Sequence, residues 1–98
     1  MTHFSTLQEL FADESRWIQK AYARSKHNRK TRIHSKRAVK WCLLGGVNKI
    51  YYRNNLEEIQ RRIHIYIIQK GYYNILDFND NPHTTITDIQ KLVADLNV

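Results

Sequence analysis

The sequence predicts a mainly α-helical fold, a small single-domain bundle of about four helices with room for a short β-hairpin between residues 16 and 34. Apolar residues recur at helical spacing in several segments, and Ser or Thr precedes some of them as a cap. The 98 residues, 42% of them hydrophobic, suffice for one core and no more. We therefore expect residues 1–98 to form one compact domain with a basic segment at 16–53.

The densest apolar run predicts a central helix over about residues 36–51. Apolar side chains at 39, 42, 43, 47 and 50 would share one face, and Ser35 precedes the run as a helix cap. Gly45 and Gly46 would lie inside this helix, where each glycine costs about 1 kcal/mol relative to alanine. We expect another backbone to approach closely there.

Three further helices are expected. The first covers about 6–12, behind two overlapping capping signals in which Ser5 pairs with Gln8 and Thr6 with Glu9. Another runs from 56 to about 70 and ends at Gly71 in a left-handed conformation. The last begins near Thr85, whose hydroxyl pairs with Asp88.

The remaining segments leave alternatives open. Residues 16–24 fit either a helix or a strand, and 25–34 reads as a basic loop or hairpin tip with a turn at Asn28. Residues 72–78 fit a short strand or an extended strap. Residues 79–82 predict a turn, and we expect Asp77 and Asp80 to be turn-forming residues rather than paired catalytic carboxylates.

The charge is strongly uneven along the chain. The net charge is +7, yet residues 16–53 hold twelve of the sixteen Lys and Arg residues and no acid. Surfaces of ordinary soluble proteins mix both signs. A polyanionic partner is therefore expected for this segment.

The predicted nucleic-acid or anion site consists of the cations of 16–40 and one hydroxyl. Its members are Arg16, Lys20, Arg24, Lys26, Arg29, Lys30, Arg32, Ser35, Lys36, Arg37 and Lys40. Within it, Ser35–Arg37 would form the first turn of the central helix, where free N–H groups favour an anion. Tyr22, His27 and His34 lie among the cations, so an unpaired base could stack there.

Other chemistries find little support. His27, His34 and His64 have no metal-ligand spacing, and the lone Cys42 is expected to be a buried, inert thiol. No catalytic motif is present, so we expect no enzyme and no cofactor. No signal peptide and no apolar run of about 18 residues occurs, and we expect a cytoplasmic protein.

Three segments together resemble a known family. Trp17-Ile-Gln…Arg24, Ser35-x-x-Ala-Val-Lys-Trp-Cys-Leu-Leu-Gly45 and Asn79-Asp-x-Pro82 precede the final Thr-capped helix in that order. This resembles a family of small bacterial and bacteriophage proteins of unknown function, over about residues 7–96. That family commonly has glycine where this chain has Lys20, and its loop after Arg24 is less basic. The resemblance implies a phage or mobile-element accessory protein and no defined activity.

Two functions remain as hypotheses. The first is a non-enzymatic protein that binds nucleic acid through the 16–40 cations. The second is a protein-binding inhibitor or adaptor, such as a phage anti-defence (anti-CRISPR) protein, that blocks an acidic or RNA-bearing host complex. In the second case, Tyr51, Tyr52, Tyr72 and Tyr73 would serve as contact residues.

Overall fold

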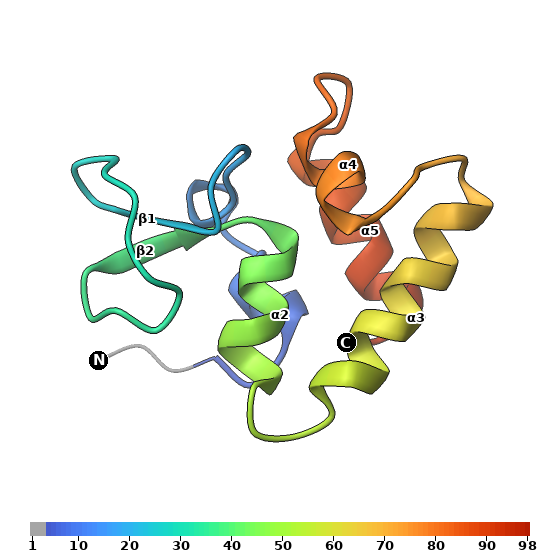
Figure 1. The fold of residues 1–98 in the computed structure, drawn as a ribbon, viewed down its shortest axis with the longest axis horizontal. Helices are drawn as coiled ribbons and strands as arrows, with labels where there is room; N and C mark the ends of the chain where they lie inside the picture. The colour runs from blue at the N-terminus through green and yellow to red at the C-terminus, as the bar shows by residue number, and fades with distance from the viewer. Residues whose placement is uncertain (1–3) are drawn as a thin grey trace.

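The computed structural model describes residues 4–98, which contain five α-helices, one 3₁₀ helix and one two-stranded antiparallel hairpin, so the predicted mainly α fold is confirmed (Figure 1). The elements follow one another as α1 (Leu7–Leu10), η1 (Glu14–Arg16), β1 (Ala23–Ser25), β2 (Ala38–Trp41), α2 (Leu43–Tyr51), α3 (Leu56–Gln69), α4 (Ile75–Asp80) and α5 (Ile86–Leu96). In Figure 1 the hairpin lies on one side, α3, α4 and α5 lie on the other, and α2 stands between them.

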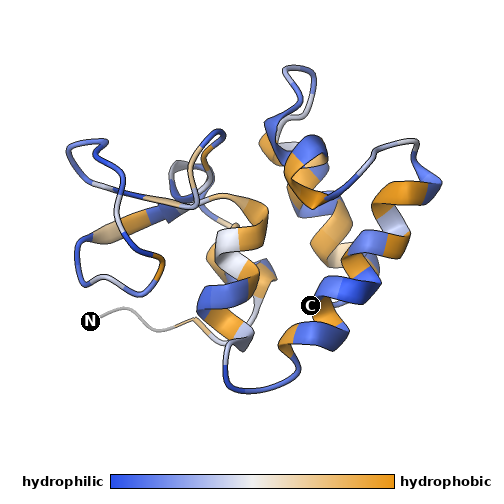
Figure 2. Cartoon of the chain, viewed as in Figure 1, coloured by the Kyte–Doolittle hydropathy of each residue, from blue (hydrophilic) through white to orange (hydrophobic). Residues whose placement is uncertain are grey.

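One hydrophobic core joins the helices. Figure 2 shows apolar residues on the inward faces of α2, α3 and α5, and the core also includes α1. The side chains with no exposed surface include Leu7, Leu10, Phe11, Leu43, Val47, Ile63, Ile67, Ile89 and Leu92. These positions repeat every three or four residues along each helix, which is the pattern that predicted them.

The predicted helix over 36–51 is wrong over its first seven residues, 36–42. Residues 38–41 form strand β2, and helix α2 begins only at Leu43. An apolar run without period-two alternation does not distinguish a buried strand from a helix. Ser35 therefore caps no helix, and its hydroxyl accepts a hydrogen bond from the Arg37 backbone at 3.1 Å. The cap of α2 is Cys42, whose Sγ accepts from the Gly45 N–H at 3.2 Å.

The hairpin also lies partly outside the predicted range of 16–34. Strand β1 pairs with β2 across a twelve-residue connection, residues 26–37, in the register Ala23 with Trp41 and Arg24 with Lys40. Val39 is the extra residue of a β-bulge, because Ser25 pairs with Ala38 instead. A turn does occur at Asn28, which has a φ of 63° and donates its N–H to the Ser25 carbonyl.

The segment after α3 differs from its prediction. Residues 75–80 form helix α4, capped by Asn74, rather than a strand followed by a turn at 79–82. The first helix, predicted over about 6–12, is shorter and covers Leu7–Leu10, but three predicted caps and stops are present. Thr6 caps α1, Gly71 follows α3 with a φ of 96°, and Thr85 and Asp88 form a reciprocal capping box at α5.

The two glycines of α2 allow close packing, as the sequence predicted. A Cβ on Gly45 would collide with the backbone carbonyl oxygen of Tyr22, next to β1. A Cβ on Gly46 would lie 2.7 Å from the Phe11 ring. Helix α2 therefore touches the hairpin segment on one side and the α1 region on the other. None of the helices within residues 4–98 is long and apolar enough to cross a membrane.

Candidate nucleic-acid interface

A buried asparagine attaches the basic half of the chain to the helical core. The Asn79 side chain is fully buried, and its Oδ1 accepts from the Trp17 indole at 2.7 Å and from the Leu43 N–H at 2.9 Å. Its Nδ2 donates to the Ile18 carbonyl at 3.1 Å and to Asp80 at 2.9 Å. All the hydrogen-bonding capacity of the amide is used. The segment before β1 is thereby fixed to the start of α2 and to α4.

The basic loop that follows β1 is also held by specific hydrogen bonds. The half-buried Thr31 donates its N–H to the Ala23 carbonyl, and the Trp41 indole donates to the Ile33 carbonyl at 3.0 Å. At the loop tip, the Ser25 hydroxyl accepts from the N–H groups of His27 and Arg29. The cations of this loop therefore project from a defined backbone.

Three cations lie in register across three extended segments. Arg24 pairs directly with Lys40 on β2 and forms an isolated bridge with Lys30 on its other side. Residues directly opposite each other in such pairs have Cβ atoms about 5 Å apart, and like charges there are destabilising. The Arg24 guanidinium donates to the Asn28 carbonyl at 2.8 Å, which is a neutral acceptor. No acidic side chain in this row therefore offsets the repulsion between the three charges.

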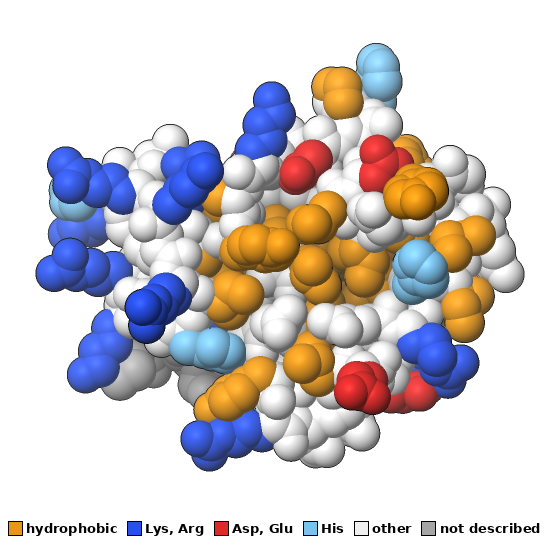
Figure 3. Space-filling view, in the orientation of Figure 1, with side chains coloured by type: hydrophobic (Ala, Val, Ile, Leu, Met, Phe, Trp, Pro, Cys, Tyr) orange, Lys and Arg blue, Asp and Glu red, His pale blue; other side chains and the backbone are white. Residues whose placement is uncertain are grey.

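The cations of residues 17–53 form no ion pair with an acid. The ion pairs within residues 4–98 are Arg16 with Asp13, Arg61 with Glu58, and Lys91 with Asp95. Figure 3 shows Lys and Arg side chains gathered on the hairpin side, whereas the Asp and Glu side chains visible there lie further toward the helices. We call the face formed by Arg24, Lys26, Arg29, Lys30, Lys36, Arg37 and Lys40 the basic face.

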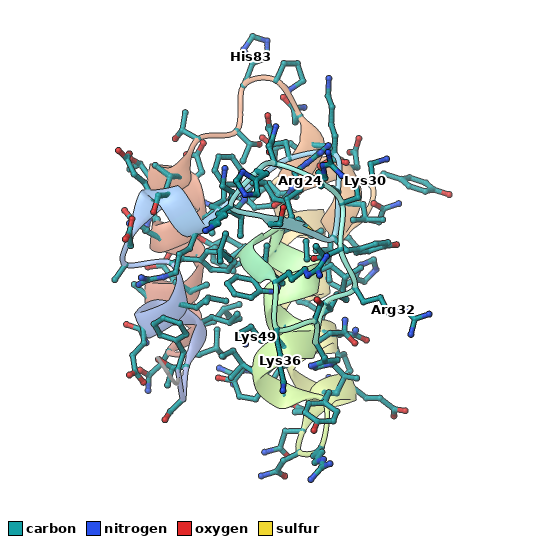
Figure 4. The ribbon with its side chains drawn as sticks, turned by 90° about the vertical axis from the view of Figure 1, so that its left-hand side faces the viewer. Arg24, Lys30, Arg32, Lys36, Lys49 and His83 are labelled. Carbon is teal, nitrogen blue, oxygen red and sulfur yellow. The ribbon has the colours of Figure 1, made fainter. Side chains whose placement is uncertain are left out.

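Two adjoining hollows run along the basic face. The first, of about 870 Å³, is lined by the loop and β2, and its cations are Lys26, Arg29, Lys30, Lys36 and Arg37. The second, of about 390 Å³, shares Lys36 and Val39 with the first and adds His34, Trp41 and Lys49. Figure 4 shows Arg24 and Lys30 above Lys36 and Lys49; of these four, Arg24 lines neither hollow.

Two predicted cations differ from the rest of the patch: Arg16 lines the second hollow but is bound to α1, and Lys20 lines neither hollow. Arg16 lies half-buried at the end of α1, where its guanidinium donates to the Leu10 carbonyl at 2.6 Å and the Glu9 carbonyl at 3.0 Å. It also pairs with Asp13 at 3.4 Å. Arg16 therefore serves the C-terminus of α1. Lys20 lies toward α4, where its backbone N–H donates to Asp80, and not in either hollow.

The helix-based anion site at Ser35–Arg37 is also wrong. No helix starts there, since residues 38–41 form a strand. The N-terminus of α2 offers no substitute, because Asn79 accepts from the Leu43 N–H and Cys42 accepts from the N–H groups of Gly45 and Gly46. Lys36 and Arg37 nevertheless line the first hollow, and Ser35 lines the second.

Sequence reasoning omitted two cations at the end of α2. Lys49 lies over the Trp41 ring, 4.7 Å from its centroid, and Arg53 lies over the Tyr52 ring at 5.1 Å. Tyr52 is 48% exposed, and its ring lies 4.4 Å from that of His34. Both residues lie in the acid-free segment 16–53, and this position could have indicated them. The predicted site, however, ended at Lys40.

The tyrosines expected at a protein interface do not form one surface. Tyr73 is 84% exposed and follows α3, whereas Tyr52 follows α2 at the opposite end of α3 (Figure 1). Tyr72 packs edge-on against Phe78, and Tyr51 is half-buried. Exposed apolar surface is instead found in a hollow of about 490 Å³ between α2, α3 and α4, lined by Leu44, Ile75 and Leu76.

Other reactive side chains have structural surroundings. Cys42 is buried, and burial raises the pKa of its thiol. Within residues 4–98, no three His, Cys, Asp or Glu side chains lie close enough to hold a metal ion. Asp77 and Asp80 lie in α4 rather than in the predicted turn, and their carboxylates accept from the Tyr73 N–H and the Lys20 N–H, respectively.

Comparison of the chain with protein-family models, with curated proteins and with solved structures finds no match.

Proposed function

We propose that this protein binds nucleic acid through the basic face. The observation that carries the proposal is the row of Arg24, Lys30 and Lys40, three cations set side by side with no acid to neutralise them. Such an arrangement costs stability in the free protein. A phosphate placed among the three charges turns that repulsion into attraction, so the row suits a polyanion better than it suits an isolated domain.

The neighbouring hollow extends the same chemistry. Lys26, Arg29, Lys36 and Arg37 are exposed side chains around one concave surface, where a phosphodiester backbone can contact several of them at once. Each phosphate that a cation neutralises releases condensed counterions, which adds about 0.9 to the salt slope of binding to duplex DNA. Contacts of this type fix position and give no base specificity by themselves.

The proposed activity is binding without catalysis. Cys42 is shielded from solvent, and the carboxylates of Asp77 and Asp80 are engaged with backbone groups of the fold. The resemblance described above adds a context, and we place this binding in the cytoplasm of a bacterium, as the task of a phage or mobile-element accessory protein.

The test removes the row and compares it with an equal loss of charge elsewhere. The variant Arg24→Gln/Lys30→Gln/Lys40→Gln should weaken binding to labelled duplex and single-stranded oligonucleotides and should reduce the salt slope between about 50 and 300 mM by about 2 to 3. The matched control Arg61→Gln/Lys70→Gln/Lys91→Gln removes one cation from α3, one that directly follows α3 and one from α5. It should retain the salt slope of the wild type. No binding by the wild type at about 50 mM salt, or equal losses in both variants, would contradict the proposal.

A second candidate function is protein binding, and the apolar hollow between α2, α3 and α4 favours it. Leu76 lines this hollow and also its neighbour beside Tyr22 and Lys30, so the apolar surface continues toward the basic side. The occupant that fits is an apolar side chain from an acidic segment of a host protein, as an anti-defence (anti-CRISPR) inhibitor would require. The variant Leu76→Gln should then abolish binding to a purified host complex and leave oligonucleotide binding intact; the reverse result would reject this candidate.

A further inference from the structure

A third hollow continues the path of the first two. It has a volume of about 390 Å³ and shares Phe4 and Lys49 with the second hollow, while its far end is lined by Tyr52, Arg53 and Asn54. The second hollow in turn shares Lys36 and Val39 with the first. The three hollows therefore follow one another from the hairpin loop to the end of α2, and we call the surface that they line the basic track.

The two ends of the basic track differ in chemistry. The loop end offers cations, with Lys26, Arg29 and Lys30 around the first hollow. The α2 end offers rings beside cations, because His34 and Tyr52 lie 4.4 Å apart and the Arg53 guanidinium lies 5.1 Å from the Tyr52 centroid. Tyr52 remains 48% exposed despite these contacts. An aromatic ring so exposed gains stability when a flat apolar partner covers it.

A double helix does not use such a ring. Its bases are stacked on one another inside the duplex, so only phosphates and groove edges reach the protein. An unpaired base presents a free π face, and stacking on an aromatic side chain is sequence-tolerant because every base has one. Rings interleaved with cations along a groove are the pattern of proteins that bind single strands.

We propose that the basic track binds single-stranded nucleic acid, with phosphates along Lys30, Lys36 and Lys49 and an unpaired base stacked at Tyr52 beside His34. This inference rests on the proposed function, and it adds the form of the ligand and a base-contacting residue. Figure 4 shows Lys30, Lys36 and Lys49 on one side of the molecule, Lys30 toward one end and the other two close together. A flexible single strand can bend through successive hollows, whereas a duplex is straight on this scale.

The experiment compares probes that have the same phosphates with and without bases. Binding of the wild type is measured by fluorescence anisotropy at one fixed salt concentration, to a twelve-nucleotide oligo-dT, to an abasic strand of equal length and to a duplex. A twelve-nucleotide oligo-U tests whether RNA is bound equally. The wild type should bind oligo-dT about tenfold more tightly than the abasic strand.

The variant Tyr52→Ala should lose about tenfold in affinity for oligo-dT and leave the abasic strand and the duplex unaffected, and Tyr52→Phe, which keeps the ring, should bind as the wild type does. Unchanged abasic binding also shows that the variant is folded. The matched control Tyr73→Ala removes a tyrosine that is 84% exposed beyond α3 and should change nothing.

The outcomes separate this inference from the proposed function. Equal wild-type affinity for oligo-dT and the abasic strand would overturn the stacking proposal and leave the basic face as a phosphate-binding surface. Equal losses by Tyr52→Ala on both probes would overturn it too. Failure of the wild type to bind any of the probes would reject the proposed function itself, and this inference with it.

Discussion

Replacing Asn79 with alanine should destabilise the fold strongly. Three groups would lose their partner: the Trp17 indole N–H, the Leu43 N–H and the Ile18 carbonyl. A buried polar group left without a partner costs about 1–3 kcal/mol. Trp17 is half-buried and regains part of its loss from water, so we expect a total of about 4 kcal/mol, a large part of the about 5–15 kcal/mol typical of a whole domain.

The assay is equilibrium unfolding in urea, followed by tryptophan fluorescence, with the slope checked for two-state behaviour. Asn79→Asp is the shape control, because it keeps the acceptor oxygen but turns the donor that faces the Ile18 carbonyl into a second oxygen. It should cost about as much as Asn79→Ala at neutral pH. Gln19→Ala, which removes two hydrogen bonds to the Asn79 and Asn81 carbonyls, should cost only about 1 kcal/mol. This reasoning would be refuted if Asn79→Ala lowered the free energy of unfolding by less than about 1 kcal/mol, or if Asn79→Asp left it unchanged.

Three further predictions concern other parts of the fold. Gly45→Ala should cost about 3 kcal/mol in the same urea assay, because its new methyl group meets backbone, whereas Gly46→Ala should cost about 1 kcal/mol or less, because the ring it meets can turn aside; equal costs would contradict the packing described. The hydrogen bond to Asp95 raises the pKa of Tyr66 to about 12, so its contribution to stability is complete below pH 10 and is lost as the pH rises toward 12. Unfolding free energies measured across that range should fall less steeply in Tyr66→Phe than in the wild type. Burial raises the pKa of the Cys42 thiol, so a thiol reagent at neutral pH should modify it no faster than the chain unfolds; rapid labelling of the native protein would show that the thiol is accessible.

The helices that the sequence predicted correctly carry local signals. Both α3 and α5 have a regular apolar stripe, and α5 also has the Thr85–Asp88 capping box. Strand β2 was mistaken for helix because its Ala-Val-Lys-Trp sequence is mostly apolar, and its partner lies in β1 across a long basic loop. The pairing that makes these residues a strand is non-local, so no window around Ala38–Trp41 contains it.

The candidate site shows the same division between local and non-local information. Composition was enough to place the cations in one segment, but the register of Arg24 with Lys40 depends on the hairpin and its bulge. The sequence predicts Arg16 as one more cation of the patch. Its hydrogen bonds to the α1 carbonyls form only when the chain folds, and the residue types do not indicate them. The role of Asn79 was hidden for the same reason, since its partners Trp17 and Leu43 lie 62 and 36 residues away.

The backbone conformation of Lys20 is one that its residue type does not indicate. Its φ is 67°, in the left-handed region that glycine adopts without steric cost and that other residues adopt at a cost of about 1 kcal/mol. The N–H of Lys20 donates to Asp80 at 2.8 Å, which helps to hold this geometry. Glycine is thus the residue best suited to this position, and the chain retains a cation there instead.

The separation of cations from acids also affects events before any contact forms. Because Lys and Arg side chains gather on the hairpin side and the carboxylates of Figure 3 lie toward the helices, the protein has an electric dipole moment in addition to its net charge of +7. In the field of a polyanion such a molecule rotates as it diffuses, so that the hairpin leads its approach. Encounters then begin in a productive orientation, and the association rate constant falls steeply once added salt shortens the Debye length below about 10 Å.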